Sequence, residues 1–488
     1  MKKFQFIIFG GTGDLTRRKL LPAFYDLLHD DLLSVDFSII AIGRRYDSKE
    51  EYLQEIHDDV KKHVRFEFDE EIWDSLAEKI KYQKMDLTKN EEYKKLKQRL
   101  DQNNALRIYY LALAPDFFEP VVECLEQNDL VENSAGMSRL VIEKPFGRDF
   151  KSARQLNNKI RSVYPEENIY RIDHYLGKEM IQNVLVIRFA NILFESIWNH
   201  KYIDNIQLIS TESVGVGQRG DYYEKAGVLK DMLQNHMLQL LTMTAMEPPA
   251  RMDSASIRSE KVKILKSLGQ INSEEIEDHL VFGQYGPGKW FGEEYKGYRQ
   301  EDNVASDSMT ETFVALKLYI DNLRWSKVPF YIKTGKRLFE KKTEIIVEFK
   351  DNIHPDYRNK FEDLNPDLLV IRIQPAEGVF LRFNAKKPGA EQKIVPVNMD
   401  FCQNCGMDFN TPGAYERLIK DLFAGDSTLF TRWDEVEYSW KFVDQISEII
   451  QKQDYDFPNY EAGSRGPKAA EHLLAKDGRK WWQVEPNF

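Results

Sequence analysis

The segment RIDHYLGKE, residues 171–179, places a carboxylate and an imidazole side by side at Asp173 and His174. A carboxylate that orients an imidazole is the arrangement used to prepare a general base. Adjacent residues are badly placed to form that pair, because neighbours on a strand point to opposite faces and neighbours on a helix lie about 100° apart. Each of the two residues therefore needs a partner from elsewhere in the chain.

A second candidate imidazole, His236, lies in the segment DMLQNH of a long predicted helix, AGVLKDMLQNHMLQLLTMTAM. His236 shares a helix face with Met232, Leu233 and Leu240, which on its own favours a histidine buried in the core. An imidazole titrates near neutral pH, so the same residue is also suited to accept a proton in catalysis. The residues alone leave both interpretations open.

Glycines follow the first predicted strand, FQFIIF. Gly10, Gly11 and Gly13 separate it from a predicted helix, DLTRRKLLPAFYDLL. A dinucleotide-binding fold needs small residues at this junction, because the turn is tight and the backbone approaches a pyrophosphate at the helix N-terminus. The pattern lacks the third glycine, since Leu15 and Thr16 stand where it would be expected. A glycine turn that binds nothing is the alternative.

The second predicted strand, FSIIAIG, is followed by Arg44 and Arg45. NAD-specific sites usually carry an acidic residue at this position, whereas NADP-specific sites carry arginine. A guanidinium can hold the 2′-phosphate of NADP with two hydrogen bonds, and a carboxylate would repel it. The position favours NADP, with use of NAD not excluded; the alternative is a pair of solvated surface arginines.

Strand-like and helix-like segments alternate through the first third of the chain, which predicts a Rossmann-like α/β domain with a doubly wound parallel sheet. Within it, Thr88 and Glu91 form a predicted capping box. After about residue 180, strands follow one another with few helices between them. This predicts an α+β domain with a large, mainly antiparallel sheet and helices on one face. The expected domains are residues 1–177 and 178–488.

The composition limits the kinds of partner. A formal net charge of −11 over 488 residues argues against a nucleic-acid or membrane-surface protein, so anionic ligands would require a local cluster of basic residues. No apolar run approaches the roughly 20 residues of a membrane span. The three cysteines, Cys124, Cys402 and Cys405, indicate a reducing compartment, and we expect a cytoplasmic protein. Cys402 and Cys405 form a C-x-x-C without a second pair, so we expect neither a metal nor a redox role.

The segments GGTGDLTRRKL, VIEKPFG, RIDHYLGKE and DMLQNH together strongly resemble glucose-6-phosphate dehydrogenases. The similarity continues through PFYIKTGKRL, RIQPAEGVF and AYERLIKDLFAGD. The resemblance implies oxidation of glucose 6-phosphate at C1 to 6-phosphoglucono-1,5-lactone, with hydride transfer to NADP or NAD, as the first step of the oxidative pentose phosphate pathway. It also implies a homodimer or homotetramer, with the broad antiparallel sheet as the contact surface.

The resemblance also assigns roles to particular residues. His236 becomes the base that takes the proton of the C1 hydroxyl, and Asp173 becomes the carboxylate that orients it. The phosphate of the substrate is assigned to His174, Tyr175 and Lys178. The other substrate contacts that it implies are Lys19, Lys144, Glu212, Asp231, Lys336 and Lys341. The expected coenzyme-binding residues are Gly10, Gly11, Thr12, Gly13, Asp14, Leu15, Arg44, Arg45, Lys144 and Pro145.

Two geometric expectations accompany these assignments. X–Pro bonds can adopt the cis form, and we expect a cis bond between Lys144 and Pro145. Asp231 and His236 are five residues apart, about 140° around an α-helix, so they are expected to line one pocket without pairing. Two other functions remain: another two-domain NADP-dependent sugar oxidoreductase, since EKP after a dinucleotide fold also occurs in inositol- and glucose–fructose-type enzymes, or a non-catalytic NADP sensor.

Overall fold

The computed structural model describes residues 3–271, 273–351, 354–356, 364–389, 393–403 and 412–484. The chain forms two compact units, which we call the first and second unit. The first unit contains Met1–Lys178, Pro249–Ser259 and Asn410–Glu437, and the second contains Glu179–Pro248, Glu260–Phe409 and Tyr438–Phe488. Nothing in the sequence suggested the two later segments of the first unit. The single boundary between residues 177 and 178 stays a prediction about domain organisation.

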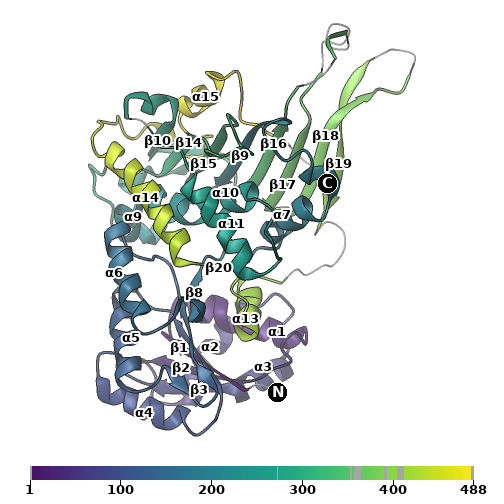
Figure 1. The fold of residues 1–488 in the computed structure, drawn as a ribbon. Coiled ribbons are helices and arrows are strands. Elements are labelled where there is room, and N and C mark those ends of the chain that lie inside the picture. The colour runs from purple at the N-terminus through teal and green to yellow at the C-terminus, as the bar shows by residue number, and fades with distance from the viewer. Residues whose placement is uncertain are drawn as a thin grey trace. The chain divides into compact units, whose positions relative to one another are not determined.

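A seven-stranded sheet, in the order β20-β8-β7-β4-β1-β2-β3, forms the centre of the first unit (Figure 1). Its parallel strands are β1 (Lys3–Phe9), β2 (Asp36–Gly43), β3 (Ile80–Lys84), β4 (Leu106–Leu111), β7 (Arg139–Ile142) and β8 (Ile169–Ile172). At one edge β20 (Phe430–Thr431) pairs antiparallel with β8. The central strands β1 and β4 are buried almost throughout, as expected of a parallel sheet covered on both faces. The predicted doubly wound sheet is confirmed.

Helices cover both sides of this sheet, in two groups whose members contact one another (Figure 1). One group is α1 (Leu21–His29), α2 (Lys49–His63), α3 (Glu70–Lys79) and α13 (Ala414–Ala424), with the π-helical segment η1 (Thr16–Leu20) leading into α1; the other is α4 (Asn90–Leu100), α5 (Phe118–Gln127) and α6 (Phe150–Arg161). The strand order reverses between β1 and β4. In folds of this type, the ligand crevice lies beyond the carboxyl ends of the strands at that point.

The predicted capping box in this unit is wrong. Helix α4 begins at Asn90 after Lys89, and no side chain caps it. Asp86 accepts hydrogen bonds from both the backbone N–H (3.1 Å) and the hydroxyl (2.8 Å) of Thr88. This local turn uses the hydroxyl that the capping box would have required, a competition that short polar side chains commonly introduce.

An eight-stranded sheet forms the second unit, in the order β10-β14-β15-β9-β16-β17-β18-β19. Its strands are β9 (Ile203–Thr211), β10 (Leu280–Gly283), β14 (Phe313–Leu318), β15 (Phe330–Gly335), β16 (Lys342–Phe349), β17 (Leu368–Gln374), β18 (Gly378–Lys386) and β19 (Ile394–Cys402). Among these described strands, β15 and β9 pair parallel and every other neighbouring pair is antiparallel. The predicted large, mainly antiparallel sheet is therefore confirmed.

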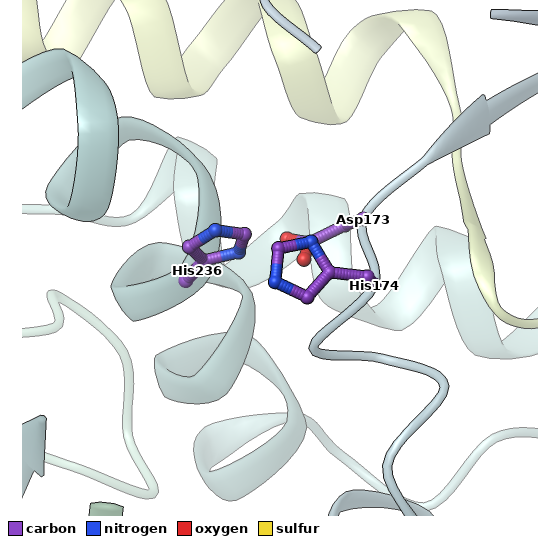
Figure 2. A group of neighbouring side chains, drawn as sticks. All are labelled: Asp173, His174 and His236. Atoms are coloured by element: carbon purple, nitrogen blue, oxygen red, sulfur yellow. The ribbon is translucent and has the colours of Figure 1, made fainter. Parts of the chain in front are cut away.

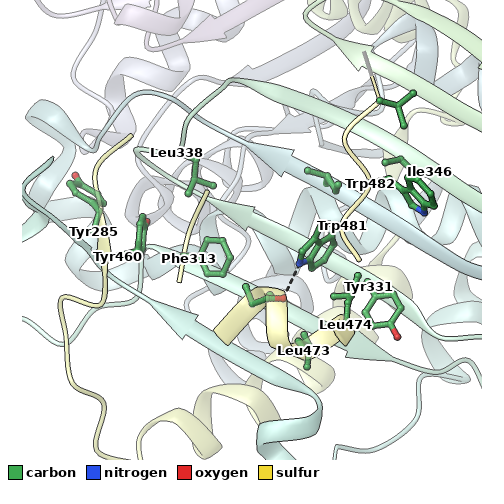
Figure 3. Close-up of a cluster of buried hydrophobic side chains, with 14 of the residues drawn as sticks. Tyr285, Phe313, Tyr331, Leu338, Ile346, Tyr460, Leu473, Leu474, Trp481 and Trp482 are labelled. Carbon is green, nitrogen blue, oxygen red and sulfur yellow. Dashed lines mark hydrogen bonds between the residues drawn. The ribbon is translucent and has the colours of Figure 1, made fainter. Parts of the chain in front are cut away.

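Other elements pack on both faces of this second sheet, rather than on the one face expected, while β18 and β19 at one edge keep mostly partly exposed or exposed residues. On one face, α7 contacts β17 and η5 contacts β15. The helices on this side are α7 (Glu179–Phe189), α9 (Gly220–Val228), the π-helical η5 (Leu229–Met237) and α10 (Leu238–Ala245). On the other face, α15 (Lys468–Ala475) and the chain through residues 481–484 pack on the strands (Figure 3). The sequence pattern of α15 and the residues after it does not by itself predict a cover for the sheet.

The remaining helices include α11 (Ser254–Lys266) and the 18-residue α14 (Trp433–Ile450). Within the described ranges, no helix combines the length and the apolar character that crossing a membrane would require. The short elements are α8 (Ile192–Glu195), β5 (Glu132–Asn133), β6 (Gly136–Met137), β11 (Tyr285–Gly286), β12 (Gly288–Trp290), β13 (Glu293–Tyr295), β21 (Tyr460–Glu461), η2 (Pro115–Phe117), η3 (Glu166–Asn168), η4 (Gly217–Arg219), η6 (Ser273–Asp278) and η7 (Tyr298–Gln300).

Trp481 anchors the cover on the second face of the large sheet. Its indole N–H donates a hydrogen bond to the carbonyl of Ala470 in α15 (2.9 Å), and its ring is buried among side chains that include Tyr331 and Leu474 (Figure 3). Large aromatic side chains of this kind bury much apolar area, and a buried indole N–H needs a partner. Trp481 thus holds α15 on the sheet through both the buried area of its ring and the hydrogen bond to Ala470.

We therefore predict that Trp481→Ala lowers the free energy of unfolding by about 3–5 kcal/mol, because a large cavity opens and the Ala470 carbonyl loses its donor. Chemical denaturation followed by circular dichroism measures this change. Leu323, which is 89% exposed, serves as the control: Leu323→Ala should change stability by no more than about 0.5 kcal/mol. Equal losses in the two variants would contradict the anchoring role.

Candidate active site

Four predicted segments in the first unit directly follow the carboxyl ends of parallel strands. Gly10 follows β1, Arg44 follows β2, Lys144 follows β7 after one residue, and Asp173 follows β8. Because these strands are parallel, their carboxyl ends lie at the same edge of the sheet. The structure therefore brings the glycine turn, the arginine pair, the EKP segment and the segment RIDHYLGKE to one edge.

The glycine turn is as tight as the sequence predicts. Gly10 has φ +90°, and a Cβ at that position would overlap the carbonyl oxygen of Ala112. A Cβ on Gly11 would lie 2.8 Å from the Cβ of Ala41. Both glycine N–H groups donate to the carbonyl of Ile42, at 3.1 and 2.7 Å. Any side chain in this turn would push β1 away from its neighbours.

The turn leads directly into the first helical segment. The carbonyl of Gly10 accepts hydrogen bonds from the N–H of Gly13 (2.9 Å) and the hydroxyl of Thr16 (3.0 Å). Asp14 begins this segment and pairs with Arg18 on the exposed side of the helix (2.7 Å). The first N–H groups of a helix have no partner within it and carry the positive end of the dipole. This geometry suits a phosphate group.

Gly43, the last residue of β2, is a site residue that the sequence did not identify. A Cβ on Gly43 would lie 2.6 Å from Cγ2 of Thr12, so the end of β2 packs directly against the glycine turn. Arg44 and Arg45 follow with exposed side chains, which form no ion pair with any described residue. The pKa of nearby Asp86 is lowered, chiefly by hydrogen bonds from the Thr88 hydroxyl and N–H and to a smaller degree by the charges of Lys89 and Arg44. The only sequence signal for Gly43 was its position before two arginines.

The EKP segment follows β7, and its predicted cis bond between Lys144 and Pro145 is confirmed. Glu143, just before it, accepts hydrogen bonds from the phenol groups of Tyr110 (2.5 Å) and Tyr415 (3.1 Å). Burial raises the pKa of Glu143 against the opposing effect of these two hydrogen bonds and of the Lys144 charge. Glu143 thus fixes the backbone from which Lys144 projects, a role the sequence did not suggest.

Residues 173–178 fold into a compact double turn after β8. Oδ1 of Asp173 accepts the N–H of Tyr175 (2.9 Å), and the carbonyl of Asp173 accepts the N–H of Leu176 (3.0 Å). Nζ of Lys178 lies 4.0 Å from the centre of the Tyr175 ring, which is 5.3 Å from the His174 ring. The imidazole, phenol and ammonium that were predicted to hold a phosphate therefore lie on one turn.

This turn is supported by α13, a helix more than 200 residues further along the chain. Arg417 donates a hydrogen bond to the carbonyl of Gly177 (3.0 Å). Arg171, within RIDHYLGKE, has a structural role: it pairs with Glu166 (2.5 Å) and donates to Asn157 (2.7 Å), and its side chain is buried. The motif therefore contains a residue that holds β8 in place beside residues suited to chemistry.

In the second unit, His236 and Asp231 both lie on η5, and their side chains are almost completely buried. Figure 2 draws His236 on this helix, with Asp173 and His174 on the chain that follows β8. The expected separation of 140° between Asp231 and His236 is wrong, because η5 is a π-helix in which the N–H of Leu238 bonds to the carbonyl of Leu233. In a π-helix the bonded residues are five apart, so Asp231 and His236 lie one turn apart along the axis.

Two predicted substrate residues of the second unit, Glu212 and Asp231, contact the ammonium group of a third, Lys336. Nζ of Lys336 bonds to the carboxylate of Glu212 and lies 3.5 Å from that of Asp231. Asp231 also accepts a hydrogen bond from the hydroxyl of Tyr222 (3.2 Å), and Arg219 lies 3.8 Å away. One ammonium group is thus shared by two carboxylates, whose remaining oxygen lone pairs can accept hydrogen bonds from hydroxyl groups.

Other predicted residues are not brought into either group. Lys341 is exposed before β16, and Lys19 is exposed on η1. Neither has an ion pair or side-chain hydrogen bond with another described residue, so their roles stay predictions. Cys405 lies outside the described residues, and the interpretation of the C-x-x-C pair stays a prediction as well.

Known proteins resemble this chain from end to end. Residues 7–183 match the family model described as "Glucose-6-phosphate dehydrogenase, NAD binding domain", and residues 185–482 match that of the C-terminal domain of the same enzyme. The chain is 47% identical to glucose-6-phosphate 1-dehydrogenase of Bacillus subtilis over 99% of both proteins. It is 44% identical to the enzyme of Chlamydia muridarum, over 97% of this chain and 96% of that one.

A solved structure agrees with the sequence comparisons. It is a glucose-6-phosphate dehydrogenase in complex with its substrate glucose-6-phosphate, 32% identical, with a TM-score of 0.90 and 99% of each chain covered. A levoglucosan dehydrogenase at 8% identity and a TM-score of 0.50, covering 93% of this chain and 98% of that one, shares the fold alone. The chain belongs to the glucose-6-phosphate dehydrogenase family.

Proposed function

We propose that this protein oxidises glucose 6-phosphate at C1 to 6-phosphoglucono-1,5-lactone, the first step of the oxidative pentose phosphate pathway, with NADP as the hydride acceptor. The observation that carries the proposal is the end-to-end match of both domains to one enzyme family. The local geometry of both units supports it. The first unit has an imidazole, a phenol and an ammonium group on one turn beside a coenzyme-type fold. The second unit has two carboxylates that share one ammonium group and can accept hydrogen bonds from sugar hydroxyls.

The edge of the parallel sheet fits NADP. The backbone at Gly10, Gly11 and Gly13 leaves room for a pyrophosphate at a helix N-terminus, since a Cβ at the first two positions would meet neighbouring chain. Thr12, Asp14 and Leu15 complete this turn, and Lys144 with Pro145 would border the nicotinamide end. Arg44 and Arg45 would bind the 2′-phosphate of NADP, and NAD would not form that contact because it has no 2′-phosphate. When bound, the coenzyme supplies the acceptor for the hydride.

His236 acts as the base in this proposal. The C1 hydroxyl gives its proton to the imidazole, the C1–H bond breaks with its electron pair, and C1 becomes the carbonyl carbon of the lactone. Asp173 accepts a hydrogen bond from the other ring nitrogen, which fixes the tautomer and stabilises the imidazolium. The buried environment of both side chains supports these roles, because charge interactions are stronger away from water.

The remaining residues hold the two ends of the substrate. His174, Tyr175 and Lys178 bind the phosphate dianion, which needs several donors. Glu212 and Asp231 accept hydrogen bonds from sugar hydroxyls, with Lys336 holding their charges in place. Lys144, Lys19 and Lys341 complete the local positive field that an anionic substrate requires of a protein with net charge −11.

One assay separates this function from its two rivals. The protein is mixed with NADP and glucose 6-phosphate, and the absorbance of the reduced nicotinamide is followed. Rapid reduction is expected. Faster reduction of NADP with myo-inositol or unphosphorylated sugars than with glucose 6-phosphate would identify another sugar oxidoreductase. Binding of NADP without reduction by any of these sugars would identify a sensor.

We also propose a cytoplasmic homodimer or homotetramer, assembled through the large sheet. The edge strand β19 supports this surface, since Met399 and Phe401 are 64% and 58% exposed. Exposed apolar side chains on an edge strand invite pairing with another chain. Light scattering of the purified protein measures the mass, and a monomer at micromolar concentration would exclude the proposed assembly.

His236→Asn is expected to lower kcat by about 100-fold or more with little change in KM for glucose 6-phosphate, because it removes a group used mainly in the transition state. Steady-state kinetics measures both constants. His279, which contacts the carbonyl of Lys317 away from the predicted site, provides the matched control, and His279→Asn should keep kcat. A near-normal kcat in His236→Asn would end the assignment of the base.

Lys178→Met is expected to raise KM for glucose 6-phosphate while affecting the slow oxidation of free glucose much less, because only the phosphorylated sugar uses the ammonium. The two substrates are compared in the same assay. Lys151→Met, at an exposed position on α6, controls for the loss of one positive charge. Equal effects on the two sugars would argue against a phosphate contact.

Arg44→Ala is expected to weaken NADP binding by about 10–100-fold and NAD binding far less, because a charged hydrogen bond to the 2′-phosphate is lost. Titration of protein fluorescence with each coenzyme measures the two dissociation constants. Lys62→Ala, an exposed change of the same charge on α2, should affect neither. Parallel losses for both coenzymes would rule out the 2′-phosphate contact.

A further inference from the structure

Two consecutive residues before β14 hold two parts of the second unit's site at once. The carbonyl of Glu311 accepts the N–H of Val228 (3.0 Å), and Oε1 of Glu311 accepts the N–H of Leu229 (3.3 Å), where η5 begins. The carbonyl of Thr312 accepts the N–H of Lys336 (3.0 Å). The helix that carries the predicted base and the lysine between the two carboxylates are therefore fixed by one short segment.

The chain before η5 is shaped around the Glu311 carboxylate. Gly227 has φ 57° and ψ −176°, a conformation that breaks the regular helix inside α9, two residues before η5 begins. A Cβ on Gly227 would overlap Oε1 of Glu311. The carboxylate therefore occupies the space of a missing side chain and lies against the N-terminal end of η5, where a negative charge is favoured.

Glu311 also lines a cavity of about 520 Å³ through which protons can reach it. The charged and titratable groups around this cavity come from α9 (Glu224 and Lys225), from η5 (Lys230) and from the chain after α14 (Asp454 and Tyr455). Tyr223 of α9 is also close enough for the charge of Glu311 to contribute to raising its pKa, after burial and the charges of Asp231 and Glu212. No other carboxylate among the described residues accepts the N–H of Leu229.

We propose that Glu311 is a positioning residue for η5, and that the charge on its carboxylate, through the hydrogen bond to the Leu229 N–H, adjusts the geometry of Asp231 and His236. In the ionised form, the bond to the Leu229 N–H is charge-assisted and the helix start is held firmly. In the protonated form, the bond weakens and the first turn of η5 loosens. The expected effect on kcat/KM rests on the proposed function. The expected effect on the first turn of η5 rests on the hydrogen bonds of Glu311 alone.

The pH range follows from the surroundings of the carboxyl. Burial raises the pKa of Glu311 to about 7, against the opposing effects of hydrogen bonds from its own N–H and that of Leu229 and of the charge of Lys230. Because the folded-state pKa lies above the ordinary value, this group's contribution to stability is full at low pH and is lost as the pH rises through about 7. Activity and stability are thus expected to change in opposite directions over the same pH range.

The kinetic test compares wild type with Glu311→Gln, which keeps the shape and an acceptor oxygen but is never charged. The ratio of their kcat/KM values for glucose 6-phosphate should be near 1 at pH 6 and rise to about 5–10 at pH 8.5, the difference between a charged and a neutral hydrogen bond. Asp454→Asn removes a charge from the same cavity without touching Leu229, and its ratio should stay flat. A flat ratio for Glu311→Gln would overturn the proposal.

Hydrogen exchange separates this inference from the enzymatic one. Amides 229–237 should exchange faster in Glu311→Gln than in wild type at pH 8, and at similar rates at pH 6 after correction for intrinsic exchange. Identical protection at both pH values would overturn the proposal, whatever the activity. If Glu311→Gln does not fold, Glu311→Asp, which keeps the charge one methylene further back, is measured in its place. A wild type that exchanges as expected but does not oxidise glucose 6-phosphate would refute the proposed function alone.

Discussion

Close backbone approach at the carboxyl ends of β1, β2 and β4 is the constraint on which the first unit depends. Gly10 lies against the carbonyl of Ala112, Gly11 against Ala41, and Gly43 against Thr12. Because no side chain fits between these segments, the turn after β1 and the end of β2 are held at fixed distance. The helix N-terminus and the exposed arginine pair are positioned by backbone packing, which leaves their side chains and N–H groups available to a ligand.

The second unit solves a different problem, which is how to bury charge. The carboxylates of Glu212 and Asp231 would repel each other if the ammonium group of Lys336 did not contact both of them. That lysine is effective only where its backbone is fixed. The hydroxyl of Tyr460 donates a hydrogen bond to the carbonyl of Lys336 (2.8 Å). The backbone N–H of Lys336 donates to the carbonyl of Thr312. The charge cluster thus depends on neutral hydrogen bonds behind it.

Sequence reasoning succeeded where the signal is local. The glycine turn, the position of the arginines after β2 and the cis bond at Pro145 each follow from a short segment, and both sheets follow from the order of strand-like and helix-like segments along the chain. It failed where the cause is distant or conformational. The contact of Arg417 with Gly177 joins residues 240 apart, and the bond from Glu311 to Leu229 joins residues 82 apart. The π-helical form of η5 has no residue pattern of its own, so the spacing of Asp231 and His236 was read with the wrong helical period.

The adjacency of Asp173 and His174 can now be understood from their surroundings. Asp173 is 2% exposed, and one of its oxygens is used to close the turn after β8. His174 is only partly buried and lies beside the ring of Tyr175. The ammonium group of Lys178 lies over that same ring. A buried carboxylate suits a single fixed partner, whereas a partly solvated cationic turn suits a phosphate that must enter and leave. Two neighbouring residues on one turn therefore meet opposite requirements, because one side chain is buried and closes the turn while the other is partly exposed beside an aromatic ring.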